Sequence, residues 1–181
     1  MDSIRLLQKY YKPDSKAYNI LLVHSMAVTK KALAVAEKVP HLSPDREFIS
    51  EAGMLHDIGI FLTNAPEIDC NGTRPYICHG YLGRELLEKE GFPKHALVCE
   101  RHVGVGLSIK DIEDQKLELP KRDMRPVTIE EEIVCCSDKF FSKNSDGGVK
   151  EKSVEQILLG IRKHNEDGVI KFKEWMIKFG D

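Results

Sequence analysis

Residues 43–59 read SPDREFISEAGMLHDIG, and this stretch carries the clearest structural signals in the chain. Ser43, Pro44 and Asp45 are typical of a helix start: a hydroxyl N-cap, a proline in the first turn and an acid at the positive end of the helix dipole. One face of the predicted helix collects its apolar residues and a histidine: Phe48, Ile49, Ala52, Leu55 and His56. Gly59 is a natural end. The stretch therefore predicts an amphipathic helix with a His-Asp pair at its C-terminal end.

Helical spacing of apolar residues recurs along the chain, and no stretch shows sustained period-two alternation. A helix should start near Asp14 or Ser15 and stop before Pro40, and a capping box at residues 128–131 should open another. With these, we expect helices at about 43–59, 76–90, 94–103, 128–141, 151–163 and 166–179, and a short one at 108–115. Residues 145–148 read as a plain linker. The sequence predicts one all-α domain, a single helical bundle of about seven helices over residues 1–181.

The composition fits one domain with a real apolar core, because 41% of the 181 residues are hydrophobic. Lys+Arg number 27 and Asp+Glu 29, a near balance that argues against a nucleic-acid polymer as partner. No apolar run reaches the roughly 18–20 residues of a membrane span, so we expect no membrane partner. Five cysteines without a C-x-x-C indicate reduced thiols, and hence a cytoplasmic protein. An oligomer is compatible with all of this.

Four histidines and two aspartates fall where apolar residues are expected. They are His24, His56, Asp57, His79, His102 and Asp138. Burying a carboxylate costs several kcal/mol unless it is paired or coordinates a cation. Imidazole nitrogens and carboxylate oxygens are ligands of divalent iron, manganese, zinc or nickel. This combination indicates a metal site.

The adjacent pair His56-Asp57 restricts where that site can lie. Neighbouring residues on a helix point about 100° apart, so both can reach one site only near a helix end. Gly59 supplies such an end.

The ordered series His24, His56-Asp57, His79, His102 and Asp138 resembles the metal-binding pattern of the HD-domain superfamily of metal-dependent phosphohydrolases. The sequence His-Asp-Ile-Gly at 56–59 is part of that resemblance. Two histidines between Asp57 and Asp138 match the two-metal branch. The resemblance covers about residues 15–145 and leaves the C-terminal helices, at about 150–179, outside the metal-binding core.

The resemblance implies two divalent ions, with iron or manganese expected first and zinc or nickel as alternatives. One ion would be held by His24, His56, Asp57 and Asp138. Asp57, the residue on which catalysis would depend, would bridge to a second ion held by His79 and His102. A hydroxide shared by the ions would attack phosphorus. The implied activity is a phosphohydrolase or phosphodiesterase acting on a small phosphorylated metabolite or nucleotide.

Basic residues near the expected ligands are candidate phosphate contacts. Lys139 follows Asp138, Arg101 precedes His102, and Arg74 lies before His79. They rank ahead of Arg125 and Lys143.

Two departures from the family pattern keep other functions open. Ile60 stands where many hydrolytic members have a lysine that contacts phosphate. The paired histidines and the G-Y-P segment of cyclic-dinucleotide phosphodiesterases are also absent, so a cyclic-di-GMP enzyme is not expected. The alternative is a mixed-valence diiron oxygenase of the same ligand pattern, and a third reading is a binding module that kept its metals without an activity.

Overall fold

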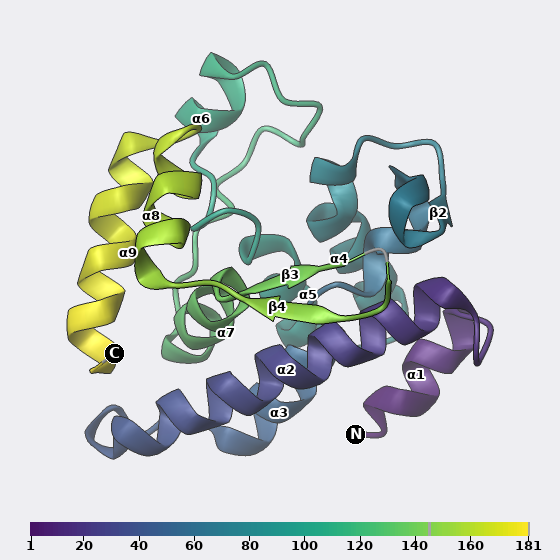
Figure 1. Ribbon diagram of the computed structural model, residues 1–181, viewed down its shortest axis with the longest axis horizontal. Helices are drawn as coiled ribbons and strands as arrows, with labels where there is room; N and C mark the ends of the chain where they lie inside the picture. Colours follow the sequence, from purple (N-terminus) through teal and green to yellow (C-terminus); the bar gives the residue numbers. More distant parts are fainter. Residues whose placement is uncertain (145, 181) are drawn as a thin grey trace.

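The computed structural model describes residues 1–144 and 146–180, and within them the chain forms nine α-helices and two small antiparallel hairpins (Figure 1). The helices are α1 Ser3–Tyr10, α2 Lys16–Lys38, α3 Arg46–Leu55, α4 His79–Lys89, α5 Pro93–Arg101, α6 Ile109–Asp114, α7 Ile129–Lys139, α8 Val154–Arg162 and α9 Glu166–Phe179. Short 3₁₀ helices join them: η1 Pro40–Leu42, η2 Ile58–Leu62, η3 Pro66–Ile68 and η4 Tyr76–Cys78. The strands are β1 Asn64–Ala65, β2 Cys70–Asn71, β3 Phe141–Lys143 and β4 Val149–Glu151. The all-α class is confirmed, and the count of about seven helices was too low, chiefly because α1 was missed.

The helix that carries the His-Asp pair begins two residues later than predicted. Asp45 is its N-cap, and the Asp45 carboxylate accepts a hydrogen bond from the Phe48 amide at 3.0 Å. Ser43 instead closes the preceding turn η1 with a left-handed backbone, at φ 49°. The predicted Ser43 cap was wrong because the chain turns once more before the helix, and a carboxylate caps as well as a hydroxyl.

A β-hairpin replaces the end of the predicted helix at 128–141. Helix α7 stops at Lys139, and β3 pairs antiparallel with β4, Phe141 facing Glu151. Three-residue strands are too short to show alternation in the sequence, so the pattern missed them. Of the predicted linker, residue 145 lies outside the described residues. Figure 1 shows the hairpin running alongside α2 across the middle of the molecule.

The long helix α2 lies at the centre of the packing and contacts α3, α7, α9 and β3. By length and mean hydropathy alone, α2 is the one described helix that could cross a membrane; half of its most apolar 18-residue window is buried in the fold. Core helices of globular bundles meet the same criterion, so the observation by itself selects neither environment.

The two C-terminal helices cover the same core. Phe172, Trp175 and Phe179 of α9 are fully buried and belong to one apolar cluster with residues of α2 and α7. The apolar face of α9 therefore covers the core.

Candidate metal centre

Five helices deliver the four histidines and two aspartates to one place. His24 comes from the middle of α2, His56 and Asp57 from the end of α3, His79 from the first turn of α4, His102 from the end of α5, and Asp138 from the last turn of α7. The side chains are buried, and Asp138 is the most accessible at 13% exposed. Five of the six sit at helix ends, where the backbone can turn a side chain inward.

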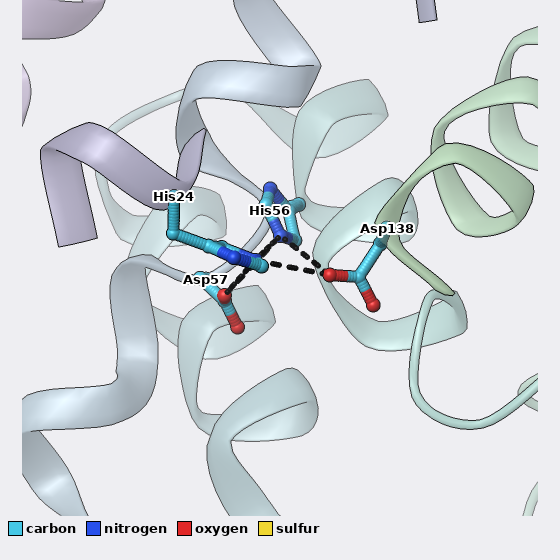
Figure 2. A group of neighbouring side chains, drawn as sticks. All are labelled: His24, His56, Asp57 and Asp138. Atoms are coloured by element: carbon cyan, nitrogen blue, oxygen red, sulfur yellow. Dashed lines mark hydrogen bonds and ion pairs between the residues drawn. The ribbon is translucent and has the colours of Figure 1, made fainter. Parts of the chain in front are cut away.

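The first group of ligand atoms is formed by His24, His56, Asp57 and Asp138 (Figure 2). His24 Nε2 lies 3.0 Å from Asp138 Oδ1 and 3.2 Å from Asp57 Oδ2. His56 Nε2 is 3.2 Å from the same Asp57 oxygen and 3.3 Å from His24 Nε2. All of these atoms can accept, so a shared cation would satisfy them together.

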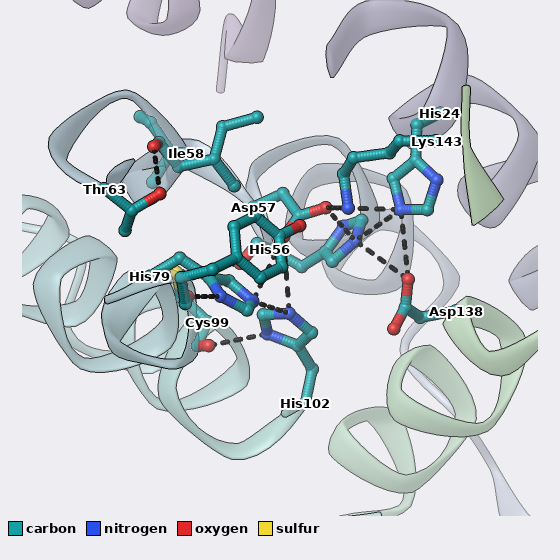
Figure 3. Close-up of polar contacts among 12 residues, drawn as sticks. His24, His56, Asp57, Ile58, Thr63, His79, Cys99, His102, Asp138 and Lys143 are labelled. Carbon is teal, nitrogen blue, oxygen red and sulfur yellow. Dashed lines mark hydrogen bonds and ion pairs between the residues drawn. The ribbon is translucent and has the colours of Figure 1, made fainter. Parts of the chain in front are cut away.

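The second group is formed by Asp57, His79 and His102 (Figure 3). The Nε2 atoms of the two histidines are 3.0 Å apart, and each lies 3.4 Å from Asp57 Oδ1. Asp57 therefore turns one carboxylate oxygen to each group: Oδ2 to the first and Oδ1 to the second.

Three of the imidazoles are oriented by the same device. Nδ1 of His56 donates to the Gly53 carbonyl at 2.7 Å, Nδ1 of His102 to Cys99 at 2.6 Å, and Nδ1 of His79 to Tyr76 at 2.6 Å. Gly53 and Cys99 lie in the last turns of their helices, where carbonyls have no intrahelical partner. With a proton on Nδ1, Nε2 of His79 and of His102 presents a lone pair to the centre, and Nε2 of His56 does so once its second proton is lost, as in metal-binding histidines.

This donor set fits divalent metal ions. Ligand atoms about 2.1 Å from a common ion, at angles of about 90–109°, lie about 3.0–3.4 Å from one another. The separations above span 3.0 to 3.4 Å. Asp57 Oδ1 is buried without a hydrogen bond among the described residues, although two imidazole lone pairs face it. Such an arrangement of acceptors is repulsive unless a cation or a proton lies between them.

The charges around the centre shift the pKa values in opposite directions. Burial opposes ionisation of Asp57 and Asp138, but Lys143 and His56 beside Asp57, and Lys139 and His24 beside Asp138, hold both pKa values well below the usual range. Burial lowers the pKa of His79 to about 3 and also lowers that of His102. For His56, burial is outweighed by Asp57 and Asp138, which raise its pKa to about 9.

The centre opens to one side into a cavity of about 520 Å³, called here the metal cavity. Its polar lining comes from the centre, from two lysines and from three further residues: Asp57, His79, His102, Asp138, Lys139, Lys143, Glu67, Tyr76 and Ser142. The volume lies within the usual range for small-molecule sites, about 300–1,000 Å³. A ligand can therefore approach both groups of metal-binding atoms from the cavity.

The three predicted phosphate contacts are placed differently by the structure. Lys139 lines the metal cavity, with Nζ 2.8 Å from Asp138 Oδ2. Arg101 turns to Glu131 and donates to both carboxylate oxygens, at 2.8 and 2.9 Å. Arg74 interacts with Tyr81, and neither arginine lines the cavity. Lys139 is brought to the centre and the two arginines are not.

Lys143 is the residue that the sequence ranked too low. It reaches in from β3, with Nζ 2.5 Å from Asp57 Oδ2 and 6.0 Å from the centre of the Tyr76 ring (Figure 3). Its side chain is 12% exposed. Ile60 is fully buried in an apolar cluster with Leu55 and Ile58, so the position after His-Asp-Ile-Gly does not face the cavity. A prediction of the β3–β4 hairpin would have placed Lys143 near the centre, but strands of three residues leave no recognisable pattern in the sequence.

Comparison with known proteins supports the assignment suggested by these motifs. An uncharacterized protein of Methanocaldococcus jannaschii is 34% identical over 138 residues, which cover 75% of this chain and 71% of that protein. The tRNA (cytidine(56)-2'-O)-methyltransferases of Picrophilus torridus and Thermoplasma volcanium are each 31% identical over 159 residues. These matches cover 83% and 87% of this chain but only 42% and 39% of the methyltransferases, so the shared part is less than half of each.

Solved structures agree on the fold. The HD domain of the L. monocytogenes phosphodiesterase PgpH in complex with cyclic-di-AMP superposes with a TM-score of 0.52 at 20% identity, over 88% of this chain and 79% of that one. A second structure of the same domain gives 0.51 at 21% identity, over 93% and 87%. The HD domain family itself matches residues 21–142. The chain therefore belongs to the HD domain family.

Proposed function

We propose that this protein hydrolyses the phosphoester bond of a small phosphorylated metabolite or nucleotide, using two divalent metal ions. One observation carries the proposal: the two oxygens of Asp57 face two separate groups of histidine nitrogens. His24, His56 and Asp138 would complete one site, and His79 and His102 the other. Imidazole and carboxylate ligands suit iron or manganese as well as zinc or nickel, and we expect iron or manganese first.

Bound there, the two ions would neutralise the phosphate and lower the pKa of water so that it attacks phosphorus at neutral pH. The protein itself contributes position and charge. The Nδ1 bonds to carbonyl groups fix the rings of His56, His79 and His102, and Asp57 holds both halves of the site in register. Hydrolysis then adds water across the phosphorus–oxygen bond: the hydroxyl group goes to phosphorus, and the oxygen of the leaving alcohol takes up the proton.

Two lysines provide positive charge on the open side. Burial opposes their protonation, but Asp138 beside Lys139 and Asp57 beside Lys143 raise both pKa values, so both are ammonium ions at neutral pH. Both line the metal cavity. Their ammonium groups can donate hydrogen bonds to phosphate oxygens as these acquire negative charge. They would thus take the role of the lysine that many family members have at the position of Ile60.

A relative's ligand agrees with the substrate class. The PgpH HD domain, similar in fold, is described in complex with cyclic-di-AMP, a small phosphorylated nucleotide. Together with the size of the metal cavity, this supports a nucleotide or a metabolite of similar size.

The test is a panel of phosphomonoesters, phosphodiesters and phosphoanhydrides offered to protein loaded with iron, manganese or zinc. We expect release of phosphate or of a phosphomonoester, and loss of that activity by at least 10³-fold in Asp57→Asn. Asp167→Asn, an exposed carboxylate on α9, is the matched control and should keep full activity. Substrate-dependent oxygen uptake by the iron form, with no hydrolysis by any form, would instead establish the diiron oxygenase.

A further inference from the structure

A second cavity, of about 530 Å³, lies beside the metal cavity and is called here the apolar cavity. It is bounded mainly by helix α8, the segment that follows α5 and the end of α6, and it is open to solvent on one side. Both cavities are lined by the same four residues: Ile77, Val103, Gly104 and Lys139. The two spaces therefore adjoin, with Lys139 at their boundary.

The walls of the apolar cavity are mainly aliphatic. They include Ile77, Val105, Leu107, Leu117, Ile157 and Ile161. Amide side chains of Gln115, Gln156 and Asn165 also line it, and among the described residues no carboxylate does. An apolar cavity with a few polar groups is the usual form of a small-molecule site.

Positive charge lies on the side of the apolar cavity that meets the metal cavity. Lys139 and Lys152 both contribute to its wall. Lys139 pairs with Asp138, whereas Lys152 forms no ion pair within the described part of the chain. Burial lowers the pKa of Lys152, and Lys139 and Lys143 act in the same direction, although Asp138 opposes them. This pattern suits a ligand whose anionic part lies at the boundary with the metal cavity and whose apolar part lies in the apolar cavity.

Gly160 gives a second, independent indication. It lies within α8 at the exposed rim of the apolar cavity, and a Cβ atom built there meets nothing within 4 Å. Glycine inside a helix is less favourable than alanine by roughly 1 kcal/mol, and no steric conflict in the fold requires it at this position. Gly160 is exposed, so the absence of a side chain there leaves the mouth of the apolar cavity open.

We propose that the apolar cavity is the subsite for the leaving group, and that the substrate is a phosphoester whose alcohol portion is bulky and mainly apolar. The inference rests on the proposed function, since the phosphoryl group would lie in the metal cavity. Lys139 then stands between the two parts, beside the oxygen that joins them. A nucleoside and an aryl or branched alkyl alcohol share this chemistry.

The test compares 2-(1-naphthyl)ethyl phosphate with ethyl phosphate, whose leaving alcohols have similar acidity, and includes AMP as the nucleoside arm. The naphthyl ester should have a KM on the order of 30-fold lower than the ethyl ester, because its ring system is removed from water. Gly160→Leu should obstruct the mouth of the apolar cavity and raise that KM at least tenfold, with ethyl phosphate hydrolysed as before. Gly160→Ala, the matched control, should leave both substrates unchanged. If the KM for AMP is as low as that for the naphthyl ester and responds to Gly160→Leu in the same way, the bulky group is a nucleoside. If AMP behaves like the ethyl ester, the bulky group is an aryl or alkyl group.

Binding gives a readout that does not depend on turnover. 2-(1-Naphthyl)ethylphosphonate should shift the amide resonances of Leu107, Leu117 and Gly160, while ethylphosphonate should leave them in place. Equal KM values for the two esters, or equal losses for both in Gly160→Leu, would overturn the subsite. Binding of the naphthyl phosphonate at these residues, without hydrolysis of any ester, would keep the subsite and remove the proposed function.

Discussion

Lys143 on strand β3 places its Nζ 2.5 Å from Oδ2 of Asp57, the carboxylate shared by both groups of metal-binding atoms. The hairpin β3–β4 thus brings a cation to the centre of a site that is otherwise built from helices. When Asp57 coordinates metal, the ammonium group is left beside the metal cavity, where a phosphate would lie.

Replacing this lysine should impair hydrolysis without removing the metals. We expect Lys143→Ala to lower kcat/KM about 10²-fold, the usual scale for losing one preorganised charge at a transition state. Lys143→Arg should retain part of the activity. Lys150→Ala, an exposed lysine on β4 of the same hairpin, is the control and should behave as wild type. Steady-state kinetics with elemental analysis checks this, and full activity in Lys143→Ala would exclude the role.

Metal uptake should release protons at one group and not at the other. His56, with its pKa raised to about 9, is protonated in the metal-free protein at pH 7.5 and must lose that proton to coordinate. His79, with a pKa lowered to about 3, is already neutral. Affinity at the first group should therefore rise with pH up to about 9, while affinity at the second should stay nearly flat around neutral pH, because burial lowers the pKa values of both His79 and His102.

Titration calorimetry at pH 7.5 in two buffers of different ionisation enthalpy measures this directly. We expect about one proton released for the ion bound by His24, His56 and Asp138, and none for the ion bound by His79 and His102. Equal proton release for both ions would contradict the assignment of charge states.

Arg101 should matter for stability and not for catalysis. It donates twice to Glu131, whose carboxylate also accepts from the Val127 amide at 2.6 Å and closes the capping box of α7. Arg101→Ala leaves a nearly buried carboxylate short of a partner, which costs about 1–3 kcal/mol in unfolding free energy. Urea denaturation checks the loss. A higher KM at unchanged stability would instead support the phosphate contact that the sequence suggested.

Removing the metals should destabilise the fold. The acceptors around Asp57 Oδ1 have no hydrogen to share in the metal-free state, and a ligand that binds only the folded state adds about 4 kcal/mol at a thousandfold excess over its Kd. Chelation should therefore lower Tm, and returning the metal should restore it. If chelator left Tm unchanged, the side chains around Asp57 would not need a cation for stability.

The sequence was informative where a side chain contradicts its surroundings. His24, His56 and Asp138 are polar residues on apolar helical faces, so periodicity alone singled them out, and the structure brings them to one place. Lys143 and the hairpin were not accessible in this way, because three-residue strands show no alternation and a lysine in a polar stretch is unremarkable. Arg101 was misleading for the opposite reason: it precedes His102, but adjacent helical residues point in different directions, and its side chain faces Glu131.

The apolar cavity could not have been read from the sequence either. Its walls come from several separated parts of the chain, and only their packing shows that Gly160 lies at the rim of a cavity.

Counting metal ions per chain tests the central claim most directly. In protein purified without chelators or a nickel column, elemental analysis should find two transition-metal ions per chain, one in His102→Ala and at most a weakly held one in Asp57→Ala. One ion in the wild type, retained in His102→Ala, would contradict a carboxylate shared between two sites.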